Sequence, residues 1–211
     1  MIRARAALRL LAALGLATLA AVSAARAAGP EGALRDGQVL RGRFVQERHL
    51  QGFKAPLRSG GHFVLAAGKG LLWRAETPFA VTTAISPAGL SQEVDGSRTL
   101  DMPAARLPFL RRLYAMLGGA LGGDWSALQK DFTVTRSGDA RHWRVLLTPR
   151  RAPDPATLPF RAITALGGRF VDSVRIDKAD GDHDDLRFLD QSLDGGPLTA
   201  AERTALAAAG T

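Results

Sequence analysis

Cysteine is absent from the 211 residues, and its absence excludes disulfide bonds and lipid attachment through a cysteine thiol. The sequence also lacks a G-x-S-x-G nucleophile elbow, a phosphate-binding glycine loop, and histidines spaced as H-x-H or H-x-x-x-H. Carboxylate pairs for glycoside hydrolysis stay open, but nothing singles out one pair. We therefore predict that the protein is not an enzyme and that it uses no cofactor and no metal ion.

Aromatic residues are scarce, at 6% of the chain, and the arginines are scattered rather than clustered. The formal net charge is +8, with 28 basic and 20 acidic side chains. Four of the arginines lie in residues 1–27, which contain no acidic residue, so the rest of the chain has 24 basic side chains against 20 acidic ones, or +4. This composition argues against nucleic-acid binding, whereas an anionic membrane surface or an acidic partner stays open.

Residues 1–27 have the three parts of a secretory signal peptide. Three arginines among the first nine residues supply the positive start, and an apolar run follows from Leu8 to Val22. Ala25 and Ala27 are small residues at the two positions that a signal peptidase reads. The run holds about 14 apolar residues, fewer than the ~20 that span a bilayer. We predict cleavage after Ala27 and a soluble periplasmic protein.

Several short stretches alternate apolar and polar residues, as strands with one buried face do. Turn signals separate them at intervals of about 8–12 residues, which is typical of an antiparallel meander. We take Gly60-Gly61 as part of a turn. The predicted strands are Arg43–Leu50, His62–Ala66, Leu71–Arg74, Thr82–Ile85, Leu90–Val94, Phe132–Arg136, Trp143–Thr148, Phe160–Leu166, Phe170–Asp177 and Asp185–Leu193.

Helical signals are fewer. Apolar residues recur at helical spacing over 109–117, before a pair of glycines, and Asp124 can cap a single helical turn. Thr199 and Glu202 form a capping box that predicts a short C-terminal helix. A short amphipathic helix is also compatible with residues 34–40, although Gly37 weakens it.

These elements predict an α+β fold with one large antiparallel sheet and helices on one side of it. The expected organisation is a signal peptide at 1–27, one domain at 28–197, and a short helix or tail at 198–211. The acidic stretch DGDHDD at 180–185 could hold a hard cation, but it lacks the glycine and glutamate of a calcium loop at the sixth and twelfth positions. We interpret it as a polar hairpin tip.

The order of these features resembles the periplasmic lipoprotein-carrier family LolA. No single motif is specific, and the resemblance depends on their succession from about residue 35 to about residue 195. The resembling stretches are GRFVQER, GGHFVLAAGKGLLW, TPF, the central helical insertion, GDWSALQKDFTV, VLLTPR and ALGGRFVDSVRIDKADGDHDDLRFLD.

The resemblance implies an incomplete, strongly curved antiparallel β-barrel, a half-barrel whose concave apolar face is covered by helices. It implies a monomeric carrier that binds the acyl chains of a lipidated cargo, either a lipoprotein or a glycolipid or polyene lipid. Such a carrier would take the cargo from an inner-membrane exporter toward an outer-membrane acceptor. The alternative is a structural or regulatory periplasmic module that binds a protein partner through the sheet and holds no lipid.

Parity within each strand selects the residues that we expect to line the lipid cavity. The central helix would act as a lid with four apolar side chains inward: Phe109, Leu113, Met116 and Leu117. The resemblance also implies an arginine that tethers the lid. Residues 66–69, which match that position, contain no arginine, so Lys69 or Arg74 would have to replace it. The predicted cavity residues are Phe44, Phe63, Leu65, Leu71, Trp73, Ile85, Val134, Val145, Leu147, Ile163, Val174 and Ile176.

Overall fold

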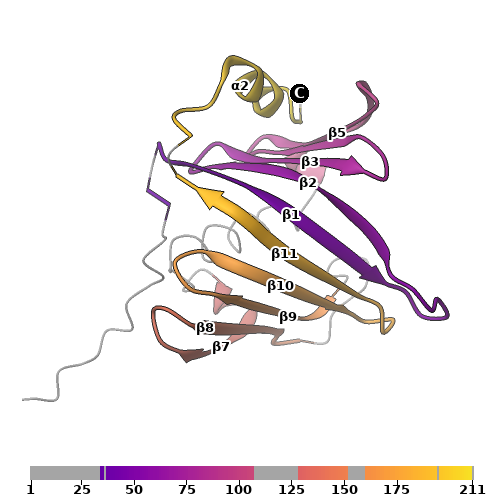
Figure 1. Cartoon of the computed structure of the whole chain (residues 1–211), viewed down its shortest axis with the longest axis vertical. Coiled ribbons are helices and arrows are strands. Elements are labelled where there is room, and N and C mark those ends of the chain that lie inside the picture. Colours follow the sequence, from indigo (N-terminus) through magenta and orange to yellow (C-terminus); the bar gives the residue numbers. More distant parts are fainter. Residues whose placement is uncertain (1–33, 36, 107–127, 152–159, 194, 211) are drawn as a thin grey trace, which may run out of the picture.

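The computed structural model describes residues 34–35, 37–106, 128–151, 160–193 and 195–210. They form an eleven-stranded antiparallel sheet, a 3-10 helix and a short α-helix (Figure 1). The strands are β1 (Val39–His49), β2 (Leu57–Ala66), β3 (Gly70–Thr77), β4 (Val81–Ile85), β5 (Gly89–Val94), β6 (Ser97–Pro103), β7 (Phe132–Gly138), β8 (Trp143–Pro149), β9 (Phe160–Gly167), β10 (Val171–Lys178) and β11 (His183–Ser192). The helices are η1 (Ala104–Arg106) and α2 (Ala200–Ala207).

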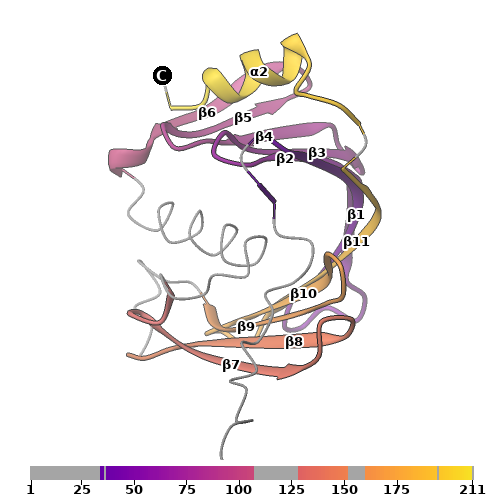
Figure 2. The same cartoon turned by 90° about the vertical axis from the view of Figure 1, so that its left-hand side faces the viewer.

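The sheet consists of two meanders joined through the first and last strands. The strand order is β6-β5-β4-β3-β2-β1-β11-β10-β9-β8-β7, so β1 to β6 are neighbours in sequence order, and so are β7 to β11. Figure 2 shows the strong curvature, with β1 and β11 at the bend and the two meanders on either side of it. In the described chain β6 and β7 end the order without pairing with each other, so the predicted incomplete antiparallel barrel is confirmed as an open sheet.

The alternation of side chains gives the sheet two different faces. In β8, Trp143, Val145 and Leu147 are buried, whereas Arg144 and Thr148 between and beyond them are exposed. Successive side chains of a strand point to opposite faces, so β8 offers one apolar row and one polar row. We call the concave side the inner face and the opposite side, on which α2 packs, the outer face.

Helix α2 begins at the predicted capping box. The hydroxyl of Thr199 accepts the backbone N–H of Glu202 at 3.2 Å, and the Glu202 carboxylate accepts the backbone N–H of Thr199 at 2.7 Å. Leu206 and Ala209 are buried against the outer face of β1 to β4. Within the described ranges, the α-helix therefore covers the outer face, and helices over the inner face stay a prediction. None of the described helices is long and apolar enough to cross a bilayer.

Two predicted elements are wrong. The helix proposed over 34–40 is replaced at its end by β1, because Val39 and Leu40 pair with Ala66 and Leu65 and bury one side chain on each face. Gly60-Gly61 lies inside β2 opposite β1, and the chain turns instead over the residues that follow His49.

Strand β6 was not predicted. Its sequence, SRTLDMP, does not alternate cleanly, and most of its side chains are exposed. It pairs with β5 at one end of the sheet order, where burial imposes little pattern on the sequence. The other strands lie where the sequence predicts them, with ends displaced by a few residues.

Candidate functional site

All twelve residues predicted to line a cavity share the inner face. Phe44 pairs with Phe188 across the junction of β1 and β11, and Phe63 pairs with Trp73. The other nine residues, with Ala165, complete rows that run across neighbouring strands. The rows are Leu65–Leu71–Ile85, Val134–Leu147–Ile163–Ile176 and Val145–Ala165–Val174. The structure therefore brings together residues that are dispersed over 133 positions of the sequence, from 44 to 176.

An aromatic cluster fills the inner face at the bend. The rings of Phe44 and Trp73 stack with centroids 3.6 Å apart, and Phe188 meets Phe63 edge to face at 5.4 Å. Phe44 lies opposite Gly61 on β2, and a Cβ on Gly61 would overlap the backbone carbonyl of Arg74 on β3. Gly61 thus permits the close approach of β2 and β3 rather than a turn, which is why the interpretation of the glycine pair from the sequence was wrong.

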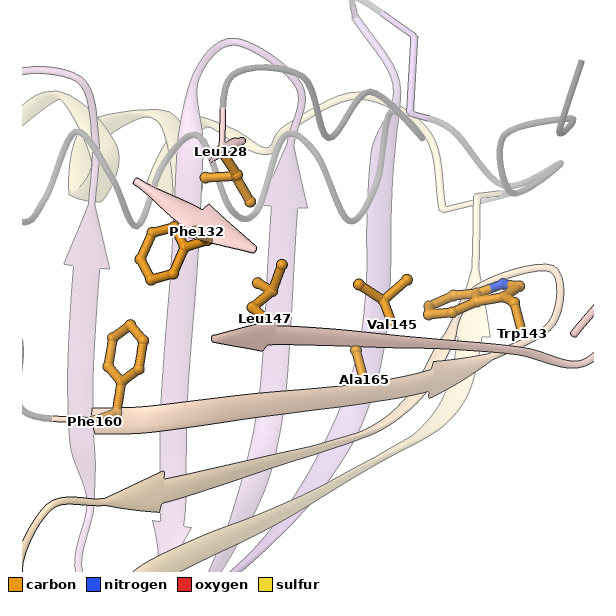
Figure 3. Close-up of a cluster of buried hydrophobic side chains, with 7 residues drawn as sticks. All are labelled: Leu128, Phe132, Trp143, Val145, Leu147, Phe160 and Ala165. Carbon is orange, nitrogen blue, oxygen red and sulfur yellow. The ribbon is translucent and has the colours of Figure 1, made fainter. Parts of the chain in front are cut away.

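A second apolar cluster occupies the inner face of the other meander, and Figure 3 shows its seven buried side chains. The Phe132 and Phe160 rings face each other at 6.0 Å, with planes 12° apart. Trp143 lies toward the other end of β8, where its indole N–H donates to the carbonyl of Gly168 at 2.7 Å. Trp143 is 3% exposed and is therefore part of the core.

Sequence reasoning missed part of this face. Phe188 lies on the inner face two positions after Leu186 on β11. The alternation within that strand was a sufficient signal to identify it. Leu40 is 1% exposed beside Phe63 and Leu65, but it was missed because β1 was expected to begin at Arg43.

Burial divides the twelve residues into two groups of equal size. Phe44, Phe63, Leu65, Ile85, Val145 and Leu147 are buried. The other six are half-buried and leave apolar surface available on the inner face. They are Leu71, Trp73, Val134, Ile163, Val174 and Ile176.

Charged side chains bound the apolar part of the inner face at one end. Asp184 is 6% exposed and is the register partner of Ile176. Its carboxylate accepts from Arg48 at 2.9 Å and lies 3.2 Å from the Lys178 ammonium. Two cations therefore compensate this buried carboxylate, as a buried charge requires.

The predicted lid residues and the candidates for the lid tether lie in different parts of the chain. Phe109, Leu113, Met116 and Leu117 lie outside the described residues, so the lid stays a prediction. Arg74 is the register partner of His62 and lies on the outer face, so it is not placed to tether a cover on the inner face. Lys69 is exposed in the turn between β2 and β3, and its role stays open.

A polar pocket of about 540 Å³ lies beside β1, β2 and β3, lined by residues that include Arg43, Arg58, His62 and Glu76. His62 Nδ1 lies 2.8 Å from Glu76 Oε1. Ser59 also lines the pocket, but it stands three positions from His62 in the same strand and so points to the other face. These lining residues therefore do not form a serine–histidine–carboxylate triad.

The DGDHDD stretch forms the connection of β10 to β11 and the start of β11, as predicted for a hairpin tip. Asp180 accepts the backbone N–H of Asp182 at 3.0 Å, which is a local turn contact. Asp184 is already bound by Arg48 and Lys178 on the inner face. The stretch does not converge on one calcium position.

Residues 32–188 match the sequence profile of a family described as outer membrane lipoprotein carrier protein LolA-like. Among curated proteins, no sequence matches this chain. Many solved structures show remote similarity, and three of them illustrate it. A LolA superfamily protein from Nitrosomonas europaea has 9% identity and a TM-score of 0.43, with 80% of this chain and 92% of that chain covered.

The other two similar structures cover 82% of this chain and 92% of their own. A DUF1329 family protein from Desulfovibrio piger has 10% identity and a TM-score of 0.43. The putative outer membrane lipoprotein-sorting protein domain from Vibrio parahaemolyticus has 9% identity and a TM-score of 0.40.

Proposed function

Because this chain belongs to the LolA-like outer membrane lipoprotein carrier family, we propose that it is a periplasmic carrier of acyl chains. The inner face is the proposed binding surface, and the cargo is a lipoprotein or another acylated lipid. The signal peptide at 1–27 would direct the chain across the inner membrane, where a membrane exporter would load it and an outer-membrane acceptor would unload it.

The observation that carries this proposal is the continuity of the apolar inner face. Twelve apolar side chains from eight strands occupy one face in register, and six of them are only half-buried. Hydrocarbon needs no chemical group for its recognition, because removing apolar surface from water is favourable by itself. An extended apolar face without reactive groups is therefore suited to acyl chains.

The strength of binding must stay limited if the cargo is to be released. Each fully buried methylene contributes about 0.8 kcal/mol, so a C16 chain in full contact would contribute more than about 10 kcal/mol. Several such chains would exceed any useful affinity. We therefore propose that the inner face holds its cargo with incomplete burial, so that an acceptor can compete for it.

Fluorescent fatty-acid binding tests the surface with matched pairs of leucines. Leu147→Gln places a polar group on the inner face, whereas Leu166→Gln alters an outer-face side chain that is 43% exposed. Leu71→Gln adds a half-buried inner position whose substitution is less damaging to folding. Inner-face variants should lose binding while remaining folded by circular dichroism, and Leu166→Gln should bind as the wild type does. Equal binding by all folded variants would refute the proposed surface.

The nature of the ligand is a separate question, and native mass spectrometry of gently purified protein addresses it. Co-purifying acyl material is expected for a carrier. Lipid-free protein that also fails to bind added fatty acid, but forms a tight complex with a protein partner, would favour the alternative of a structural or regulatory module.

A further inference from the structure

Two histidines meet on the outer face where β1 ends and β11 begins, a place that Figure 1 shows at the lower right. His49 and His183 are register partners, and their rings stack with centroids 4.3 Å apart and planes inclined by 12°. The next pair on the same face is Glu47 and Asp185. Two imidazoles and two carboxylates therefore occupy the corners of one square on two adjacent strands.

The ligand atoms of this square lie close to one another. Asp185 Oδ2 lies 3.7 Å from His49 Nε2 and 3.6 Å from His183 Nε2, and Glu47 Oε2 lies 3.9 Å from His49 Nε2. One ligand atom from each of His49, His183 and Asp185 fits within a spread of 4.8 Å. A tetrahedral Zn²⁺ with bonds of about 2.0–2.1 Å needs ligand atoms about 3.3 Å apart. Because the lone pair of Nε2 lies in the plane of its ring, the two stacked rings must also turn out of their near-parallel arrangement so that both nitrogens face the ion.

Arginines contact both carboxylates. Glu47 Oε1 lies 3.0 Å from Arg58 Nε, which leaves Oε2 toward His49. Asp185 accepts from Arg175 at 3.3 Å through the oxygen that faces both histidines and at 3.4 Å through the other one. Ligating carboxylates are themselves hydrogen-bonded in metal sites, and such contacts orient them.

The surroundings do not give the square a large net charge. Arg187 lies 3.6 Å from Glu47, and Asp177 is the register partner of His183 and is bonded to Arg175. With Arg58 and Asp185, this face holds three arginines and three carboxylates around the two imidazoles. A divalent cation is therefore neither strongly repelled nor strongly attracted at long range, and binding depends on direct ligation.

We propose that His49, His183 and Asp185 bind a borderline divalent metal ion such as Zn²⁺, with Glu47 as the fourth ligand. Two imidazoles and a carboxylate favour Zn²⁺ or Cu²⁺ over Ca²⁺ and Mg²⁺, which prefer oxygen ligands. The ion would link β1 to β11, the pair through which the two meanders join. Histidines 134 positions apart, at 49 and 183, carry no local spacing motif, which explains why the sequence alone predicted no metal site.

Metal titration of the untagged mature chain tests this site. Zn²⁺ at a large excess over its dissociation constant should raise the Tm by several degrees, because it binds the folded state selectively. His49→Gln and His183→Gln should each weaken calorimetrically measured Zn²⁺ binding at least about tenfold and abolish the Tm shift. His62→Gln is the matched control, since it removes an outer-face histidine outside the square.

Nuclear magnetic resonance of the imidazole signals gives an independent measurement. Substoichiometric Zn²⁺ should shift or broaden the His49 and His183 signals before those of His62 and His142, and Mg²⁺ should change none of them. The proposal is overturned if the four histidines respond together, if the folded His49→Gln and His183→Gln variants bind Zn²⁺ as tightly as the wild type, or if no Zn²⁺ binds. Fatty-acid binding by His183→Gln should be unchanged, which separates this site from the inner face.

Discussion

Neutralising Glu202 should loosen α2 from the outer face. Its carboxylate is 8% exposed and accepts Arg41 Nη2 at 2.8 Å, and the same oxygen accepts the backbone N–H of Thr199 at 2.7 Å. Glu202→Gln keeps the shape and the acceptor oxygen but removes the charge. The hydrogen bond from the Thr199 N–H, worth about 1.5–3 kcal/mol to a carboxylate, thereby becomes a neutral one worth about 0.5–1.5 kcal/mol, and Arg41 loses its counter-charge. We therefore expect a loss of about 1–2 kcal/mol in unfolding free energy.

Arg41→Met should cost more than Glu202→Gln. The guanidinium also donates to the backbone carbonyls of residues 195–197 at 2.9–3.1 Å, so it fixes both α2 and the segment that leads to it. A double-mutant cycle by urea unfolding should give a coupling of about 1–2 kcal/mol. Hydrogen exchange of residues 200–207 should accelerate in both single variants. A coupling below about 0.3 kcal/mol, with unchanged exchange, would refute the reasoning.

The same contact predicts a pH dependence. Burial alone would raise the pKa of Glu202, but hydrogen bonds from the Thr199 backbone and from Arg41 hold the pKa below its ordinary value of 4.5. The unfolded state then binds the proton more readily, so the stabilisation is present above the ordinary pKa and is lost as pH falls through the lowered one. The stability difference between wild type and Glu202→Gln should shrink as pH falls below the ordinary pKa of 4.5. A difference that stays constant as the pH is lowered would contradict this assignment.

Three further substitutions test packing and capping. Gly42→Val should destabilise the sheet by about 1–3 kcal/mol in urea unfolding, because a Cβ at this position would lie 2.6 Å from the ring of Phe63; unchanged stability would show that the ring moves freely. Trp143→Phe should lower the unfolding free energy by about 1–2 kcal/mol, since the carbonyl of Gly168 loses its indole donor, and no loss would mean that another donor replaces it. Thr199→Ala should cost about 1 kcal/mol and speed hydrogen exchange in α2, and slower exchange would contradict its role as the cap.

The faces of the sheet were predictable because burial of one face makes apolar and polar residues alternate along a strand. The alternation of Val145 and Leu147 predicts the inner face of β8 without information on the neighbouring strands. The capping box of Thr199 and Glu202 likewise predicts α2. Choosing alternate residues within each strand selected twelve residues that share one face of the sheet. They share it because register partners in neighbouring strands point to the same side.

Strand pairing between distant parts of the chain was not predictable. The histidine square depends on the alignment of β1 with β11, and local patterns contain no information about that register. Gly60-Gly61 was misread for a similar reason. A glycine pair has the same local signature in a turn as in a strand whose neighbour comes close to its backbone, as β3 does at Gly61. The exposed strand β6 lacked a pattern because burial constrains it little.

The pairing of β1 with β11 also governs the time at which the protein can fold. Phe44 on β1 is the register partner of Phe188 on β11, so the centre of the sheet joins residues that are 144 positions apart. Each meander can form from local hairpins. A chain that emerges N-terminus first, however, cannot complete the bend until β11 has also emerged. High contact order of this kind slows folding. If the predicted signal peptide directs export of the unfolded chain through a narrow channel, a sheet whose closing strand comes last keeps the chain unfolded until nearly all of it has crossed.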